Sequence, residues 1–266
     1  MKKNKNRVVV ILIIVIAVLI ALTIVLLNRG RLNPEDKLVK NLYGLIEQSL
    51  DNCNGMILYQ DKQIDYVNLN DEEKICLALD LVSSNENVEL SVKKNKDYCA
   101  FAKDKLFLVT DEENKKCNIK KIDYLLVKKE YENLYNKSLE STQDIKLSGE
   151  TSCFYSKEDN SYLCGTANQR NIVVGWEPTS YRLIDKVVKK GSTIIIYDYF
   201  MLINSNICYI DNNETEDKDC SKVLKSNPKT KINNTFVKKY GQKYKHIFKL
   251  NEETNNYYWE SSSPIK

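Results

Sequence analysis

The stretch that decides the fold is Tyr181–Leu202, which reads YRLIDKVVKKGSTIIIYDYFML. Two runs rich in β-branched and aromatic residues lie on either side of the short segment Lys190-Gly191-Ser192. Such runs favour strands, and a glycine-containing break between them is typical of a β-hairpin. We therefore predict a long antiparallel hairpin with strands at residues 181–188 and 193–202.

The second of these strands also carries large side chains at alternate positions. Tyr197 and Tyr199 share a face with Ile195 and Met201, because successive strand residues point to opposite sides of a sheet. Aromatic residues on strands usually belong to the core, so we expect this face to be buried. The other elements predicted after residue 149 are a hairpin at 153–164 that turns at 157–160, a strand at 206–210, a short helix at 235–240 and a last hairpin at 244–250 and 257–261.

The sequence before residue 149 contains three helix start signals. Asn33 can cap a helix that has Pro34 at its first position, Asn70 and Glu73 have the spacing of a capping box, and Asp123 precedes an apolar run. The apolar spacing after each signal predicts helices at 33–50, 70–82 and 123–136. Short strands are expected at 56–59, 88–92 and 99–109.

This order of elements, helices first and sheet afterwards, predicts an α+β fold with a mainly antiparallel C-terminal sheet. The polar stretch Thr142–Gly149 is the best internal boundary. It separates a helix-rich α+β region at 33–140 from a mainly antiparallel β region at 148–266. The alternative is that the two regions form one continuous domain.

Residues 8–27 form an apolar run of twenty residues that only Thr23 interrupts. A helix of this length spans about 30 Å, the hydrocarbon thickness of a bilayer. The run is longer than the apolar part of a cleaved signal peptide, and no small-x-small cleavage site follows it. We therefore predict a short basic cytoplasmic tail at 1–7 and an uncleaved, single-pass transmembrane helix at 8–27 that contacts the lipid bilayer. A buried core helix is the alternative.

The orientation of this helix follows from two arguments, since basic residues flank it on both sides. Long domains cross a membrane largely regardless of charge. All eight cysteines lie C-terminal to the helix, where an even number suits an oxidising compartment. We expect a protein of the cell membrane with residues 28–266 outside the cytoplasm. Ala17 and Ala21 have the small-xxx-small spacing of associating helices, which leaves a homo-oligomer open.

The cysteines, taken in chain order, form four local pairs that close short loops. Cys153 and Cys164 bracket a predicted hairpin, where opposed Cα atoms lie within the range of a disulfide. The sequence has no CxxC motif and a single histidine, which argues against a zinc or thiol redox site. Free buried thiols and a metal site are the alternatives. The predicted disulfides are Cys153–Cys164, Cys208–Cys220, Cys99–Cys117 and Cys53–Cys76.

The common catalytic and cofactor motifs are missing from the sequence. The eight glycines are too far apart for a GxGxxG or a Walker loop, and no GxSxG motif supports a hydrolase triad. His246 alternates with Tyr244 and Phe248 on a predicted strand, so we interpret it as a packed side chain rather than an acid–base group. No catalytic residue, cofactor or metal is predicted.

Two features remain as candidates for ligand binding. Residues 211–219 carry oxygen-bearing side chains at alternate positions, but Glu216 and Lys222 stand where an EF-hand requires Gly and a bidentate Glu. We interpret this segment as a solvated turn closed by a disulfide, with a non-standard calcium site as the alternative. Trp176 and Trp259 are candidate surface residues for contact with a sugar or a protein.

The chain beyond the predicted anchor is formally neutral. Four of the 40 basic residues lie in the tail at 1–7, so 36 basic residues face 36 acidic ones. The longest basic runs are pairs such as Lys93-Lys94 and Lys238-Lys239. Nucleic-acid binding needs a basic patch or stripe, so we expect no nucleic-acid partner.

The sequence therefore predicts a membrane-anchored extracytoplasmic module of a bacterial envelope that has a binding or structural role and is not an enzyme. An envelope protein or a glycan is the expected partner. The alternatives are an envelope hydrolase that acts on glycan or peptide through carboxylates the sequence does not reveal, and an extracellular ligand sensor. All three hypotheses rest on the order of the anchor and the domain along the chain and not on an identified functional site.

Overall fold

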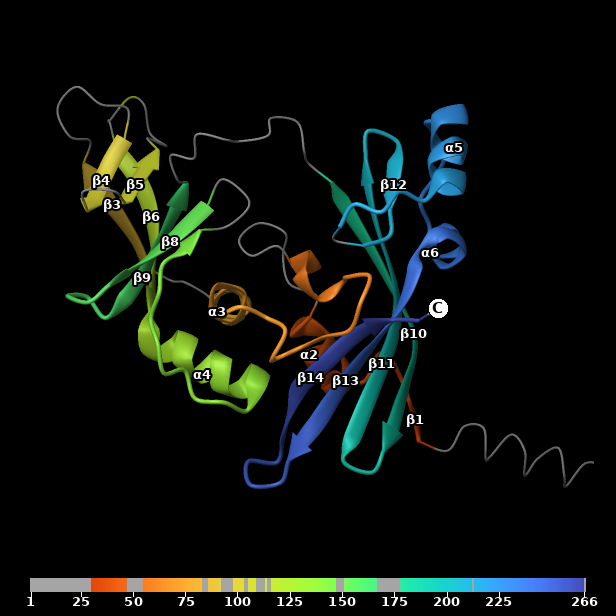
Figure 1. Cartoon of the computed structure of the whole chain (residues 1–266), viewed down its shortest axis with the longest axis horizontal. Coiled ribbons are helices and arrows are strands. Elements are labelled where there is room, and N and C mark those ends of the chain that lie inside the picture. The colour runs from red at the N-terminus through yellow and green to blue at the C-terminus, as the bar shows by residue number, and fades with distance from the viewer. Residues whose placement is uncertain are drawn as a thin grey trace, which may run out of the picture.

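The computed structural model describes residues 30–46, 55–82, 86–91, 98–102, 105–108, 113, 116–146, 151–166, 178–211 and 213–265. These residues form two antiparallel sheets, a separate two-stranded hairpin and helices that pack on the sheets (Figure 1). The mixed α/β composition with mainly antiparallel pairing confirms the predicted fold class at that level.

The larger sheet is built around the hairpin predicted from Tyr181–Leu202. Strands β10 (Thr179–Lys190) and β11 (Thr193–Asn204) pair along their whole length. The turn between them contains Gly191 with a φ of 58°, which is a conformation that glycine adopts without a steric penalty. The order of the described strands is β1-β10-β11-β13-β14-β2, and β12 pairs with the end of β11. The other members are β1 (Arg31–Leu32), β2 (Ile64–Asp65), β12 (Ile207–Tyr209), β13 (Gln242–Asn251) and β14 (Asn256–Pro264).

The smaller sheet has the described strand order β3-β6-β9-β8-β7, and β4 and β5 form a hairpin of their own. Strand β6 precedes the polar stretch at 142–149 and pairs with β9, which follows it. Strands on both sides of the predicted boundary therefore belong to one sheet, while the division into domains stays a prediction. The bounds are β3 (Glu86–Ser91), β4 (Tyr98–Ala102), β5 (Lys105–Leu108), β6 (Lys116–Asp123), β7 (Ile145–Lys146), β8 (Thr151–Ser156) and β9 (Ser161–Thr166).

The helices begin where capping chemistry allows. Asn70 accepts a hydrogen bond from the backbone N–H of Glu73 at 2.8 Å, and the Glu73 side chain accepts one from the Asn70 N–H, so the predicted capping box is confirmed. Asp123 caps its helix as predicted. The described helices are α2 (Lys37–Gly44), the 3₁₀ turn η1 (Gly55–Leu58), α3 (Asp71–Asp80), α4 (Tyr124–Tyr135), α5 (Lys218–Ser226) and α6 (Asn234–Tyr240).

Three local predictions are wrong. The first helix begins at Lys37, because Asn33 forms a turn in which its side chain accepts from the Glu35 N–H at 3.0 Å. The strand expected at 56–59 is instead η1. Helix α5 was not predicted, because its start lies in a segment rich in acidic and amide residues that reads as a loop.

Packing covers both faces of the larger sheet. One face of β11, with Ile194, Ile196, Phe200 and Leu202 fully buried, belongs to a core that also contains residues of α2, α3 and α4. The opposite face carries Met201 and is covered by α5 and α6 (Figure 1). The predicted core face of β11 was therefore the wrong one: apart from Met201, its members Ile195, Tyr197 and Tyr199 are only half-buried.

Among the residues that the structure describes, none of the helices has both the length and the apolar character needed to cross a bilayer. The predicted anchor at 8–27 lies outside these residues. The anchor therefore stays a prediction.

Candidate functional site

The core of the larger sheet contains a chain of hydrogen-bonded polar side chains. Asp198 on β11, His246 on β13 and Ser262 on β14 are fully buried. The Nε2 of His246 lies 3.0 Å from Oδ1 of Asp198, and its Nδ1 lies 2.6 Å from Oγ of Ser262. Strand pairing sets this arrangement, since His246 is the register partner of Ser262 on one side and of Ile196 on the other.

Neighbouring donors fix the direction of the hydrogen bonds in this chain. The indole N–H of Trp259 donates to Oγ of Ser262 at 2.9 Å. The Asp198 carboxylate only accepts, so Nε2–H of His246 donates to it, and in the tautomer that carries its proton on Nε2 the Ser262 hydroxyl donates to Nδ1. Every polar atom of His246 and Ser262 then has a partner inside the core.

Two tyrosines complete the coordination of the Asp198 carboxylate. The hydroxyls of Tyr43 and Tyr59 each donate to Oδ2 at 2.8 Å. Burial raises the pKa of Tyr59 well above its usual value, and the nearby Asp198 charge raises it further. Burial likewise raises the pKa of Tyr43. Both hydroxyls therefore stay protonated and remain donors at neutral pH.

A cation lies beside the tyrosines of this cluster. The Arg182 guanidinium lies 5.0 Å from the centroid of the Tyr59 ring and donates to the Ile46 carbonyl at 3.3 Å. Its charge lowers the pKa of both tyrosines against the raising effects of burial and of Asp198. The acid–histidine–serine order is that of a hydrolase triad, but a nucleophilic serine must reach a substrate. Ser262 is fully buried, so the network holds the sheet together and presents no nucleophile to solvent.

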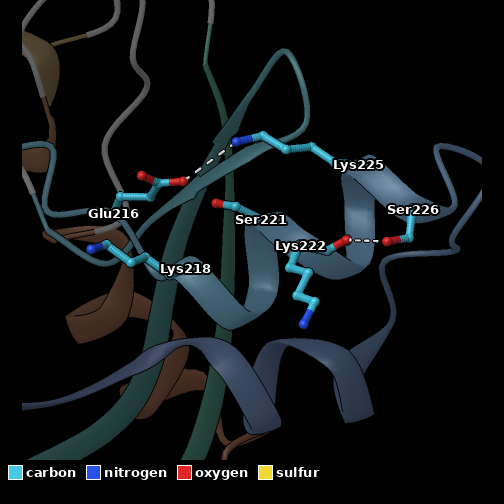
Figure 2. A pocket seen from close by; sticks show the side chains of 6 residues that line it. All are labelled: Glu216, Lys218, Ser221, Lys222, Lys225 and Ser226. Atoms are coloured by element: carbon cyan, nitrogen blue, oxygen red, sulfur yellow. Dashed lines mark hydrogen bonds and ion pairs between the residues drawn. The ribbon is translucent and has the colours of Figure 1, made fainter.

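A second cluster lies at the surface, on helix α5. It lines an open depression of about 460 Å³ with Lys218, Lys222 and Lys225, together with Glu216, Ser221 and Ser226 (Figure 2). The three lysines follow the i, i+4, i+7 spacing of one helix face. One carboxylate against three ammonium groups leaves the depression with an excess of positive charge.

Local contacts hold α5 in place below this depression. Oδ1 of Asp217 accepts from the Cys220 N–H at 2.7 Å and caps the helix. The buried Ser221 hydroxyl oxygen accepts from the Cys208 N–H at 3.0 Å, which joins α5 to β12. The disulfide Cys208–Cys220 fixes the same connection. The lysines therefore extend from a rigid base.

Only one of the three lysines has an ion-pair partner in the part of the chain that the structure describes. Lys225 lies 3.6 Å from Glu216, in a pair exposed to solvent on both sides. Exposed pairs of this kind contribute little stability and exchange readily with other anions. The depression can therefore bind anionic groups, and the described residues offer no cluster of three or more metal-ligating side chains.

Some predictions about individual site residues are confirmed, one is wrong, and others fall outside the described residues. Three of the four predicted disulfides are confirmed, and Cys76 is disulfide-bonded, while Cys53 lies outside the described residues. Trp259 is wrong as a surface residue, because it is 1% exposed and hydrogen-bonds inside the core. Trp176 lies outside the described residues.

The structure also shows the surroundings of His246 and of the acidic segment at 211–219. His246 is packed as predicted, but its partners were not foreseen. Asp211 is buried, and its Oδ1 accepts from the N–H groups of Asn213 and Thr215 at 3.0 Å each. That oxygen serves the local turn, which supports the interpretation of residues 211–219 as a turn closed by a disulfide.

Comparison with known proteins gives no relative for this chain. No protein-family model, curated protein or solved structure matches it.

Proposed function

We propose that the protein is a membrane-anchored binding module whose folded part lies outside the cytoplasm. The observation that carries the proposal is the set of three buried disulfides, two in the region of the smaller sheet and one between β12 and α5. Structural disulfides persist in oxidising compartments and are rare in the cytosol. The apolar run at 8–27 supplies the anchor.

The binding role rests on the lysine-lined depression on α5. It is exposed, rigidly based and rich in groups that attract anions. The side chains of the buried polar network, in contrast, hydrogen-bond to one another within the core. We therefore assign the interaction surface of the module to α5.

Cysteine labelling in cells with a sealed cytoplasmic membrane tests the location. Lys157→Cys places a thiol in the exposed turn between β8 and β9, and Asn6→Cys places one in the predicted tail. A membrane-impermeant maleimide should label the first variant before lysis and the second only after lysis. The reverse pattern overturns the proposed orientation, and labelling of neither variant before lysis overturns the external location.

The disulfides are tested on the same material. Wild-type protein denatured without a reductant should leave its cysteines unlabelled, and a reductant should expose them. If all eight cysteines label without reductant, the disulfide framework and the argument from compartment both fail.

A further inference from the structure

Charge in this chain is segregated although its sum is balanced. Residues 220–251 contain nine lysines and no Asp or Glu. Of the 36 basic and 36 acidic residues beyond residue 27, the other segments therefore hold 27 basic and 36 acidic ones. The nine lysines are Lys222, Lys225, Lys229, Lys231, Lys238, Lys239, Lys243, Lys245 and Lys249.

The fold brings most of these lysines together on α5, α6 and the segment between them. Both helices pack on the same face of the larger sheet, through a shared core that includes Leu224 and Val237. The hydrogen bond to Tyr240 raises the pKa of Lys239 in α6, and the charge of Asp219, which is exposed in the first turn of α5, raises it slightly further. We call the exposed lysines of α5, of α6 and of the segment between them the lysine surface. It consists of six of the nine lysines, Lys222, Lys225, Lys229, Lys231, Lys238 and Lys239, together with Lys218 in the first turn of α5.

Most of the lysine surface is free to meet an external anion. Lys225 pairs with Glu216, and Lys238 lies 3.1 Å from Asp185. For the other members, no ion-pair partner occurs among the described residues. In Figure 2, Lys222 extends away from Glu216, whereas Lys218 extends toward the segment that carries Glu216.

The chemistry of the surface favours a partner with many charges. Each lysine is a flexible point charge without the fixed fork of arginine, so it recognises charge density rather than the shape of one group. The depression is open, and exposed lysines continue from it over the following segment. We infer that the lysine surface binds linear polyphosphate, a flexible chain of closely spaced phosphate groups. The surface is a basic patch that the short basic runs of the sequence do not reveal, so the reason for expecting no nucleic-acid partner no longer holds.

The position of the surface favours such a polymer over the anchoring bilayer. The chain enters the larger sheet at β1, where Arg31 is the partner of Val188 on β10. Helix α5 contacts β12, which pairs with the end of β11 opposite Ser180. About eight strand residues separate the two places, a distance of roughly 26 Å, and Figure 1 shows β1 and α5 at opposite ends of the sheet. Lipid headgroups near the anchor are therefore badly placed for the lysines of α5, although Lys238 of α6 lies closer to the chain entry, beside Asp185 on β10.

This inference rests on the proposed function for its setting, and purified protein tests it. Full-length protein in phosphatidylcholine nanodiscs is titrated with long-chain polyphosphate at several salt concentrations. The variant Lys218→Glu/Lys222→Glu/Lys225→Glu should bind about tenfold more weakly, and its slope of log affinity against log salt should fall by about 3. The matched control Lys62→Glu/Lys157→Glu/Lys190→Glu changes the net charge equally at exposed sites on other elements. It should lose about twofold or less.

Four results overturn the inference. These are no binding by the wild type, equal losses in the two triple variants, a loss confined to the control, and tighter binding to phosphatidylglycerol vesicles than to polyphosphate through the same lysines. The last result identifies a membrane as the partner. Circular dichroism and thermal melting check folding, and Lys218→Gln/Lys222→Gln/Lys225→Gln replaces the reversal variant if that variant unfolds. Because the titration does not depend on cellular location, its failure and a failure of the labelling test are separate outcomes.

Discussion

Asp198 holds the buried network together, because its one carboxylate accepts hydrogen bonds from three side chains. The three donors lie on three separate segments of the chain. Asp198 therefore joins α2, the segment after η1 and β13 to the centre of the sheet. A buried carboxylate is stable only when hydrogen bonds and a nearby cation compensate for lost hydration. Tyr43, Tyr59 and His246 provide the hydrogen bonds, and Arg182 lies over the Tyr59 ring as the nearby cation.

Asp198→Asn should therefore destabilise the protein strongly. The amide keeps the shape of the side chain, but its NH₂ donates where the carboxylate accepted. The hydroxyls of Tyr43 and Tyr59 or the imidazole of His246 must therefore reorient, and the negative charge near these groups is lost. We expect a loss of about 3 kcal/mol in the free energy of unfolding. Urea unfolding followed by circular dichroism measures it.

The control for this substitution is Asp36→Asn. Asp36 is exposed and its side chain makes no capping hydrogen bond, so the change should stay within about 0.5 kcal/mol. A comparable effect of the two substitutions would show that the buried network contributes nothing specific.

The ion pairs of Asp185 connect three elements of the fold. Its carboxylate on β10 contacts Lys238 on α6 at 3.1 Å and also Lys243 on β13. The hydrogen bond from Lys243 lowers the pKa of Asp185 against the opposing effect of burial. Because the pKa is lower in the folded state, this group stabilises the fold above the unfolded value of about 3.9 and loses that effect as pH falls through the folded value.

The stability of Asp185→Asn should differ from that of the wild type in a pH-dependent way. The variant should be less stable at pH values from about 5 to 7, and the difference should shrink as pH falls below about 4. Urea unfolding at a series of pH values gives both curves. A difference that stays constant down to acid pH would show that packing, and not the ionised carboxylate, explains the effect.

A further prediction concerns the disulfide between β12 and α5. Cys208→Ala/Cys220→Ala removes one of the contacts that tie α5 to the sheet. Amide hydrogen exchange should become faster in residues 218–226 and stay unchanged in the paired strands β10 and β11, because local opening follows local contacts. Uniformly faster exchange would mean that the disulfide stabilises the whole fold instead.

Local chemistry explains which elements the sequence predicts. The capping box of Asn70 and Glu73 and the cap of Asp123 act within one helical turn, so they are visible in the sequence. The face of β11 was misassigned because both faces are apolar, and only the packing of α5 and α6 distinguishes them. The buried network is still less visible: Asp198, His246 and Ser262 meet only after three strands pair in the correct register.

For the whole molecule, the sequence predicts the disulfide pairing well and the distribution of surface charge only in part. Short loops favour sequential pairing, and three such pairs occur. A count of basic pairs missed the lysine surface, because its members are spread over residues 218–239 and approach each other only when α5 and α6 fold onto one face. The acid-free interval at 220–251 was the signal that could have revealed it.

The attachment of the folded part to the predicted anchor gives a test of the whole arrangement. Residue 30 is already part of the sheet edge, since the Lys189 N–H donates to the Gly30 carbonyl at 2.6 Å. A chain that lacks residues 1–29 keeps β1 and the covered edge of β10, so it should fold and unfold like the full-length protein.

Without the apolar run, this shortened chain should leave the membrane fraction. The full-length chain should stay there through a wash with high salt or alkaline carbonate, because burial of about twenty apolar residues does not depend on ionic strength. The salt wash matters, since the lysine surface can hold the shortened chain on anionic membranes by charge alone. Retention of the shortened chain after high salt would place a membrane attachment in the folded part, and release of the full-length chain by the same wash would contradict an anchor at 8–27.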